Sequence, residues 1–78
     1  MFAILQGIRA LDFTANDGGH VIGTQLFISF DETGVVGKAT DKVFVKQGVE
    51  LPAKLQPGAK LDIAFDRKVK VEGVYTAE

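Results

Sequence analysis

Apolar and polar residues alternate along most of this chain with a period of two, which is typical of β-strands. No stretch carries a helical period over three turns, although residues 51–55 could form a single helical turn. Turn-forming residues interrupt the alternation at roughly regular intervals, at residues 16–19, 31–34, 56–58 and 66–67. The strands expected between these turns are residues 2–13, 20–30, 36–46, 60–66 and 68–75.

Glycines lie inside three of the expected strands, at Gly7, Gly23 and Gly73. A glycine within a strand marks a bend or a close approach of backbone, and a long bent strand can serve both halves of a barrel. We therefore expect an all-β protein with a single domain over residues 1–78, folded as a small five-stranded OB-type barrel with glycine-bent strands. Barrels of this type bind oligonucleotides across one face.

The strand expected over residues 36–46 has two unlike faces. One face carries Lys38, Thr40, Lys42, Phe44 and Lys46. The other carries Ala39, Val43 and Val45, with Asp41 as the one polar exception. Lysines beside an aromatic ring suit a ligand that is both anionic and flat, such as single-stranded nucleic acid. The alternative is a half-buried strand whose lysines are only solvated.

The strand expected over residues 20–30 contributes a second outward aromatic ring. Its alternation directs Leu26 and Ile28 to the core and Phe27 away from it. Phe27 either stacks on bases or packs under a loop or in a dimer interface. The first strand is apolar on both faces, with Leu5, Leu11 and Phe13 expected opposite Phe2, Ile4 and Ile8, so it is central in the sheet or covered by a partner chain.

Composition limits the possible chemistry. The chain has no cysteine and one histidine, His20, with no carboxylates clustered near it, so we expect neither a metal site nor a cofactor. Catalysis needs a nucleophile with a base, a pair of carboxylates or a metal, and none is evident, so we expect no enzyme and no catalytic residues. The N-terminal apolar stretch lacks a basic leader and is too short to span a bilayer, which predicts a cytoplasmic protein.

Charge and size bear on the partners. Nine Lys and Arg residues against ten Asp and Glu residues give a net charge of -1, whereas a nucleic-acid-binding domain is usually basic. The lysines nevertheless concentrate in the third expected strand, and acidic residues gather at the turns, so the local field favours anion binding there. A 78-residue chain buries a thin core, so dimerisation is a natural way to gain buried area.

The layout resembles that of the small helix-destabilising, single-stranded-DNA-binding proteins of phages and mobile elements, typified by the filamentous-phage gene V protein. The matching elements are Asp12-Phe13 at the end of the first strand, the turn at residues 16–19, Phe27, the lysine-rich third strand and the Leu55-Gln56-Pro57-Gly58 turn. The resemblance implies an OB-type barrel, a homodimer and cooperative, sequence-tolerant coating of single strands during DNA replication.

Two functional hypotheses follow. The first is a protein that binds single-stranded DNA, with RNA left open as a ligand, through lysine contacts to phosphates and aromatic stacking on bases. The second is a protein-interaction or assembly module in which Phe27, Phe44, Val21 and Val74 form an apolar interface and the lysines are solvated. Tyr75 either stacks on a base or covers the barrel end. The candidate nucleic-acid-binding residues are Arg9, Phe27, Lys38, Lys42, Phe44, Lys46, Arg67 and Tyr75.

Overall fold

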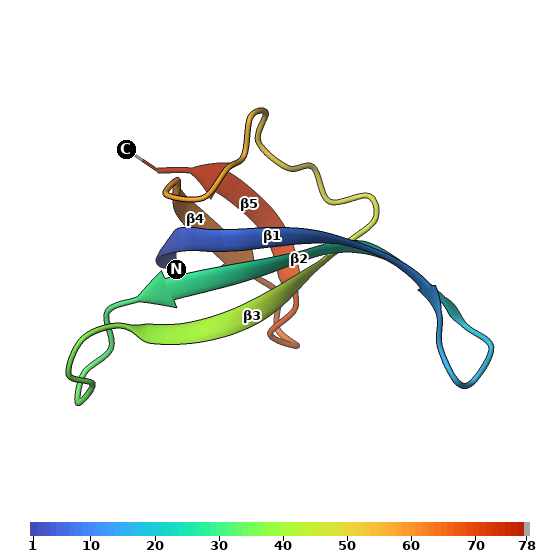
Figure 1. Cartoon of the computed structure of the whole chain (residues 1–78), viewed down its shortest axis with the longest axis horizontal. Coiled ribbons are helices and arrows are strands. Elements are labelled where there is room, and N and C mark those ends of the chain that lie inside the picture. The colour runs from blue at the N-terminus through green and yellow to red at the C-terminus, as the bar shows by residue number, and fades with distance from the viewer. Residues whose placement is uncertain (78) are drawn as a thin grey trace.

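A computed structural model describes residues 1–77 as a single antiparallel sheet. Its five strands are β1 (Phe2–Thr14), β2 (His20–Phe30), β3 (Ala39–Lys46), β4 (Lys60–Phe65) and β5 (Val71–Thr76). They lie in the order β3-β2-β1-β4-β5 (Figure 1). The predicted all-β class is confirmed. The described residues form no helix, so none is long and apolar enough to cross a membrane.

The first strand serves two parts of the sheet, as its glycine predicts. β1 pairs with β2 along most of its length and with β4 only over its first residues, from Phe2 to Ile4. A β-bulge between Leu5 and Gly7 separates these two parts. The bulge also changes the alternation of side chains. Leu5 and Ile8, expected on opposite faces, therefore both lie on the inner face, opposite residues of β2 that belong to the core.

The sheet curls but does not close into a barrel. β3 and β5, the two outer strands of the sheet, contact each other. No ladder of hydrogen bonds joins them within residues 1–77, so the expected barrel stays open along this seam. The core fills the inside of the curled sheet. It consists of Ala3, Leu5, Leu26, Ile28, Val45, Leu61, Ile63, Val71 and Val74.

The position of Val74 corrects a prediction. We expected Val74 to point outward, but it is only 3% exposed and belongs to the core. The register between β4 and β5 shifts where Phe65 pairs with Val71 and Ala64 pairs with Gly73. This irregularity inserts Glu72 into β5, so Val71 and Val74 both face inward although strict alternation would separate them. Val74 is therefore not part of an exposed apolar surface.

The β1–β2 hairpin extends beyond the rest of the sheet as an arm, which we define as residues 8–22 (Figure 1). β3 flanks β2 only from Gly23 onward, and β4 flanks β1 only up to Ile4. No core residue lies in the arm. The rest of the curled sheet, with its core, is called the body below.

The tips of the arm and of the β4–β5 hairpin have the same turn. In the arm, the Ala15 N–H donates to the Gly19 carbonyl and the Gly18 N–H donates to the Ala15 carbonyl. In the β4–β5 turn, the Asp66 N–H donates to the Lys70 carbonyl in the same way, and the Val69 N–H donates to the Asp66 carbonyl. Such a turn requires a positive φ at the residue that precedes its last residue. Gly18 has φ +88° there, and Val69 has φ +59°.

Candidate nucleic-acid interface

The outer face of β1, β2 and β3 brings together five of the eight candidate residues. In the register of the sheet, Phe27 lies opposite Lys42, and Gln25 lies between Arg9 on β1 and Phe44 on β3. Residues directly opposite each other on antiparallel strands share a face of the sheet. We call this surface the outer platform. It consists of Arg9, Phe27, Lys42, Phe44 and Lys46.

The Phe27 ring lies against Gly7 of the neighbouring strand. A Cβ atom at Gly7 would be 3.5 Å from the Phe27 Cδ2 atom, which is ordinary van der Waals contact. The Arg9 guanidinium carbon lies 5.7 Å from the centroid of the same ring, and the Arg9 Nη2 atom donates a hydrogen bond to the Gln25 side chain. A cation at this distance is attracted to the face of the ring. The positive charge of Arg9 is thereby held on the platform beside an aromatic ring.

The Phe44 ring occupies the space above Gly23 of β2. A Cβ atom at Gly23 would lie 2.5 Å from Phe44 Cζ and 2.5 Å from the Val45 carbonyl oxygen, so only glycine fits here without rearrangement. Phe44 is nevertheless 40% exposed, because the side of its ring away from Gly23 is open to solvent. Each aromatic ring of the platform is therefore supported by a glycine of the next strand. Phe44 is exposed and Phe27 half-buried, and a ring with an open face on a firm support is suited to stacking with a nucleic-acid base.

The cations of the platform form no salt bridge within the described residues, although the charge of Lys46 acts on the Asp66 carboxylate. Within residues 1–77, no carboxylate lies within salt-bridge distance of Arg9, Lys42 or Lys46. Asp41 belongs to the same strand, but alternation directs it to the other side. The net charge of -1 is therefore not shared evenly over the surface, and this face is cationic.

A groove continues from the platform around the edge of β3 toward the β4–β5 turn. Its volume is about 680 Å³, and it is lined mostly by apolar side chains. Lys42, Phe44 and Lys46 form one wall. Phe65, Val69, Lys70 and Val71 lie on the other side. The groove thus adds a third lysine, Lys70, near the two on β3.

Hydrogen bonds within the β4–β5 turn fix the far wall of this groove. The Asp66 Oδ1 atom accepts from the backbone N–H groups of Lys70 (3.0 Å) and Lys68 (2.9 Å). These two bonds, the Lys70 bond foremost, hold the pKa of Asp66 below its ordinary value. Desolvation opposes this lowering, and the positive charges of Lys46 and Lys70 add to it. Asp66 therefore remains a carboxylate at neutral pH and keeps the turn in place.

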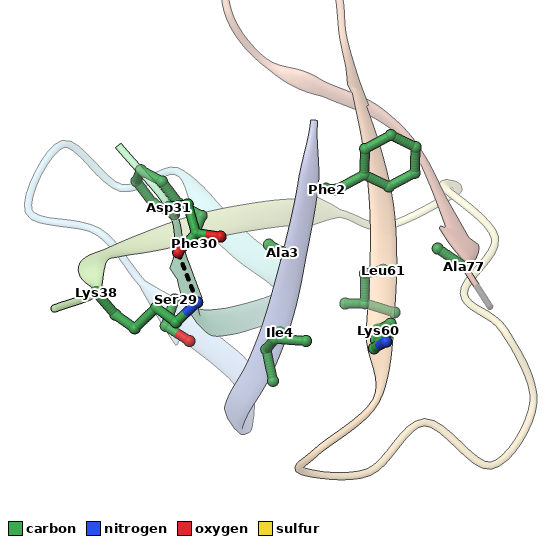
Figure 2. A pocket seen from close by; sticks show the side chains of 10 residues that line it. All are labelled: Phe2, Ala3, Ile4, Ser29, Phe30, Asp31, Lys38, Lys60, Leu61 and Ala77. Carbon is green, nitrogen blue, oxygen red and sulfur yellow. Dashed lines mark hydrogen bonds and ion pairs between the residues drawn. The ribbon is translucent and has the colours of Figure 1, made fainter. Parts of the chain in front are cut away.

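Three candidate residues lie away from the platform. Lys38 precedes β3, which begins at Ala39 rather than at residue 36, and its Nζ atom pairs with Asp31 Oδ1 at 2.6 Å. Figure 2 shows this pair at a separate pocket that also contains Phe2 and Lys60. Tyr75 covers Gly73 and borders a shallow pocket with residues 50–53. It is 59% exposed and lies apart from the platform.

Arg67, the third of these residues, is exposed in the β4–β5 turn and does not line the groove itself. Sequence reasoning also missed two residues that the structure adds. Lys70 reaches the groove only because the sheet curls and brings the β4–β5 turn toward β3. Gln25 holds Arg9 through a hydrogen bond between neighbouring strands. The sequence does indicate the direction of Gln25, because it lies two residues from Phe27 on the same strand and therefore points outward as well.

The described part of the chain contains no group of three or more His, Asp or Glu side chains that could hold a metal ion. The platform presents rings and cations, and the groove adds apolar side chains, Lys70 and one carboxylate, Asp41. No protein-family model, characterised protein or solved structure matches this chain. The function is therefore inferred from the geometry of the platform.

Proposed function

We propose that this chain is a sequence-tolerant single-stranded-DNA-binding protein, and that it serves the replication of a phage or mobile element as the resemblance implies. The observation that supports the proposal is the outer platform, where two glycine-supported rings share a face with three cations that form no salt bridge within residues 1–77. Bases stack on Phe27 and Phe44, and Arg9, Lys42 and Lys46 contact phosphates. Stacking on an aromatic ring accepts any base, so binding is sequence-tolerant.

The platform favours single strands over duplex for a physical reason. The two rings can stack only on bases whose faces are exposed, and in a duplex those faces are covered by neighbouring base pairs. The phosphate contacts alone are available to both kinds of ligand. Each stacking contact contributes about 1–3 kcal/mol. The preference for single strands therefore depends on the rings and the salt dependence on the lysines.

Fluorescence anisotropy with labelled oligo-dT, at low and at high salt, tests the proposal. Binding is expected at low salt and should weaken as salt rises, because the release of cations from the phosphates favours binding less when the surrounding salt concentration is high. Phe27→Ala and Phe44→Ala are each expected to weaken binding by about tenfold, equivalent to about 1.4 kcal/mol. The matched control is Phe2→Ala, which removes an exposed ring outside the platform.

Substitution of the lysines separates charge from stacking. The logarithm of the affinity falls with the logarithm of the salt concentration. Lys42→Ala is expected to make this fall shallower by about 0.7, the value for one phosphate contact on a single strand. Lys54→Ala, an exposed lysine in the loop between β3 and β4, should leave the slope unchanged. Absence of oligo-dT binding at low salt would rule out the proposed function. Equal effects of the platform and control variants would rule out the platform as its site.

A second candidate function is an assembly module without nucleic-acid binding. Exposed apolar side chains at Ile8, Phe13 and Ile22 in the arm favour it, whereas burial of Val74 removes one member of the expected interface. Light scattering of the Phe27→Ala and Phe44→Ala variants distinguishes the two functions. Loss of self-association with unchanged oligo-dT affinity per chain would favour the assembly module.

A further inference from the structure

The arm leaves one edge of β1 without a neighbouring strand. β2 pairs with β1 up to Thr14, while β4 pairs with its other side only up to Ile4. The loop before β4 covers that side as far as Leu5, through hydrogen bonds with Gly58 and Ala59. From residue 7 to residue 14, nothing in the described chain pairs with this edge. An exposed strand edge is a template for pairing with another strand.

This edge has few of the features that discourage pairing, and its charged residues, Arg9 and Asp12, are of opposite sign. Its eight residues contain no proline and no lysine, and the β-bulge lies before them. By contrast, β3, which has no ladder on its side toward β5, carries Lys42 and Lys46. Lysines on an edge strand oppose pairing with another chain. The β1 edge thus carries one charge of each sign and no lysine, whereas the β3 edge carries two lysines.

The backbone groups available for pairing can be identified from the arm's turn. The Ala15 N–H donates toward β2, to the Gly19 carbonyl. Because these groups alternate in direction along a strand, those of every second residue before Ala15 also point toward β2. The groups of the intervening residues point to the open edge. These residues are Ile8, Ala10, Asp12 and Thr14.

A second copy of this chain satisfies these groups in one register. When two β1 strands run antiparallel, the four edge-facing residues of each pair fully with those of the other only if Leu11 lies opposite the partner's Leu11. Ile8 then pairs with the partner's Thr14, and Ala10 with the partner's Asp12. The antiparallel direction also places Arg9 toward the acidic tip of the partner's arm, which contains Asp17. A parallel arrangement in register would set Arg9 opposite its own copy.

The same register brings side chains together on the outer face. Arg9 lies opposite the partner's Phe13 in a pair without backbone hydrogen bonds, where side chains approach most closely. Arg9 already lies beside the Phe27 ring, so the partner's ring would flank it on the other side. Phe13 is 48% exposed in the single chain, and this pairing would cover it.

We propose that a second copy of this chain pairs with the open edge of β1, antiparallel and centred on Leu11, and thereby joins the two outer platforms. A two-fold axis perpendicular to the sheet relates the copies, so both outer faces point the same way. The partner's Phe13 thus extends each platform. The pairing itself does not require nucleic acid. Only the joining of the platforms depends on the proposed function.

Sedimentation of the full chain without nucleic acid tests the pairing. The chain is expected to sediment as a dimer, and Ala10→Pro as a monomer, because proline removes an N–H that points to the partner and not to β2. Leu11→Lys should also give a monomer, since it sets two like charges opposite each other. Val36→Lys introduces the same charge at a fully exposed loop residue and should stay dimeric. A monomeric chain, or a dimer that survives Leu11→Lys, would overturn the proposal.

Disulfide formation tests the register without relying on a disruptive variant. The chain has no cysteine, so Leu11→Cys introduces a single thiol. In the proposed register the two thiols lie opposite each other, and the Cα separation of about 4.5 Å is within the range that a disulfide spans. Leu11→Cys should therefore form a covalent dimer under mild oxidation much faster than Val36→Cys. Equal rates would overturn the register.

Oligo-dT binding distinguishes the pairing of two chains from the proposed DNA-binding function. Only the joined platform rests on that function. Phe13→Ala should weaken binding several-fold in the disulfide-linked Leu11→Cys dimer and have no effect in the Ala10→Pro monomer. An equal effect of Phe13→Ala in both backgrounds would contradict the joined platform. If neither form binds oligo-dT but the dimer and the disulfide form, the proposed function fails and the pairing stands.

Discussion

The arm and the body share the same strands and the same alternation, yet they differ in what covers their apolar side chains. Ile28 and Ile22 both lie on the inner face of β2, six residues apart in sequence. Ile28 is 1% exposed in the body, whereas Ile22 is 41% exposed in the arm. The difference arises because the curled sheet covers its own inner face only where β4 and β5 reach. Alternation thus specifies which way a side chain points, but not whether anything lies there to bury it.

The largest expected effect comes from making the same substitution in both regions. Ile28→Ala should lower the free energy of unfolding by about 2–5 kcal/mol, the cost of a cavity in a core. Ile22→Ala should lower it by less than about 1 kcal/mol, because its side chain is already partly in water. Urea unfolding at low protein concentration, where self-association is weak, measures both. Similar losses for the two variants would mean that the arm is as well covered as the body.

The boundary between the regions can be tested at two glycines. Gly23→Ala should cost about 1–3 kcal/mol of unfolding free energy, since its Cβ would collide with Phe44 and the Val45 carbonyl. Gly7→Ala should change this free energy by less than about 0.5 kcal/mol, because its Cβ would only touch Phe27. Neither glycine has a positive φ, so the contrast reports on space alone. Equal costs in urea unfolding would refute the close approach of Phe44 to Gly23.

The tips of the two hairpins offer a third contrast. Val69 occupies the left-handed position that glycine fills in the arm, and a β-branched residue is strained there. Val69→Gly should therefore raise the unfolding free energy by about 1 kcal/mol, as measured by thermal or urea unfolding. Val36→Gly, in a fully exposed loop position, is the control and should give no gain. A loss of stability in Val69→Gly would show that contacts of the valine outweigh the strain.

The smallest expected effect concerns pH and the β4–β5 turn. The pKa of Asp66 is lowered in the folded chain, so its stabilising contribution is complete above its ordinary value of 3.8 and is lost as pH falls through the lowered pKa. Asp66→Asn removes this contribution. The unfolding midpoints of the native chain and the variant should differ at neutral pH and converge in acid. A constant difference at all pH values would contradict the lowered pKa.

The sequence predicted the strands and the outward rings because both depend on local alternation. Phe27 and Phe44 share a face, as expected, since no irregularity interrupts the pairing of β2 with β3. The errors fall where an extra residue breaks the period. Leu5 and Ile8 lie on one face because of the bulge in β1, and Val74 is buried because of the irregularity in β5. Neither extra residue has a distinctive side chain that would reveal it beforehand.

Other features of the candidate site depend on contacts between distant segments. Lys38 is an even number of residues from Lys42 and Lys46, so alternation would place it on the same face. The strand begins after Lys38, however, and its side chain pairs with Asp31 away from the platform. Lys70 has no special signal in the sequence, yet the curl of the sheet brings it to the groove beside β3. The open edge of β1 is equally invisible in the sequence, because it reflects where β4 stops pairing.

The glycines beneath the two platform rings have a thermodynamic consequence for any ligand. A mobile surface side chain must give up its rotamer freedom when it is immobilised by a ligand, which costs about 0.5–1.5 kcal/mol per residue. Phe44 is already confined by Gly23, and Phe27 by Gly7 and Arg9. Much of that entropy is lost when the chain folds, before any ligand arrives. The two rings are therefore preorganised, and a larger share of their contact energy remains as affinity.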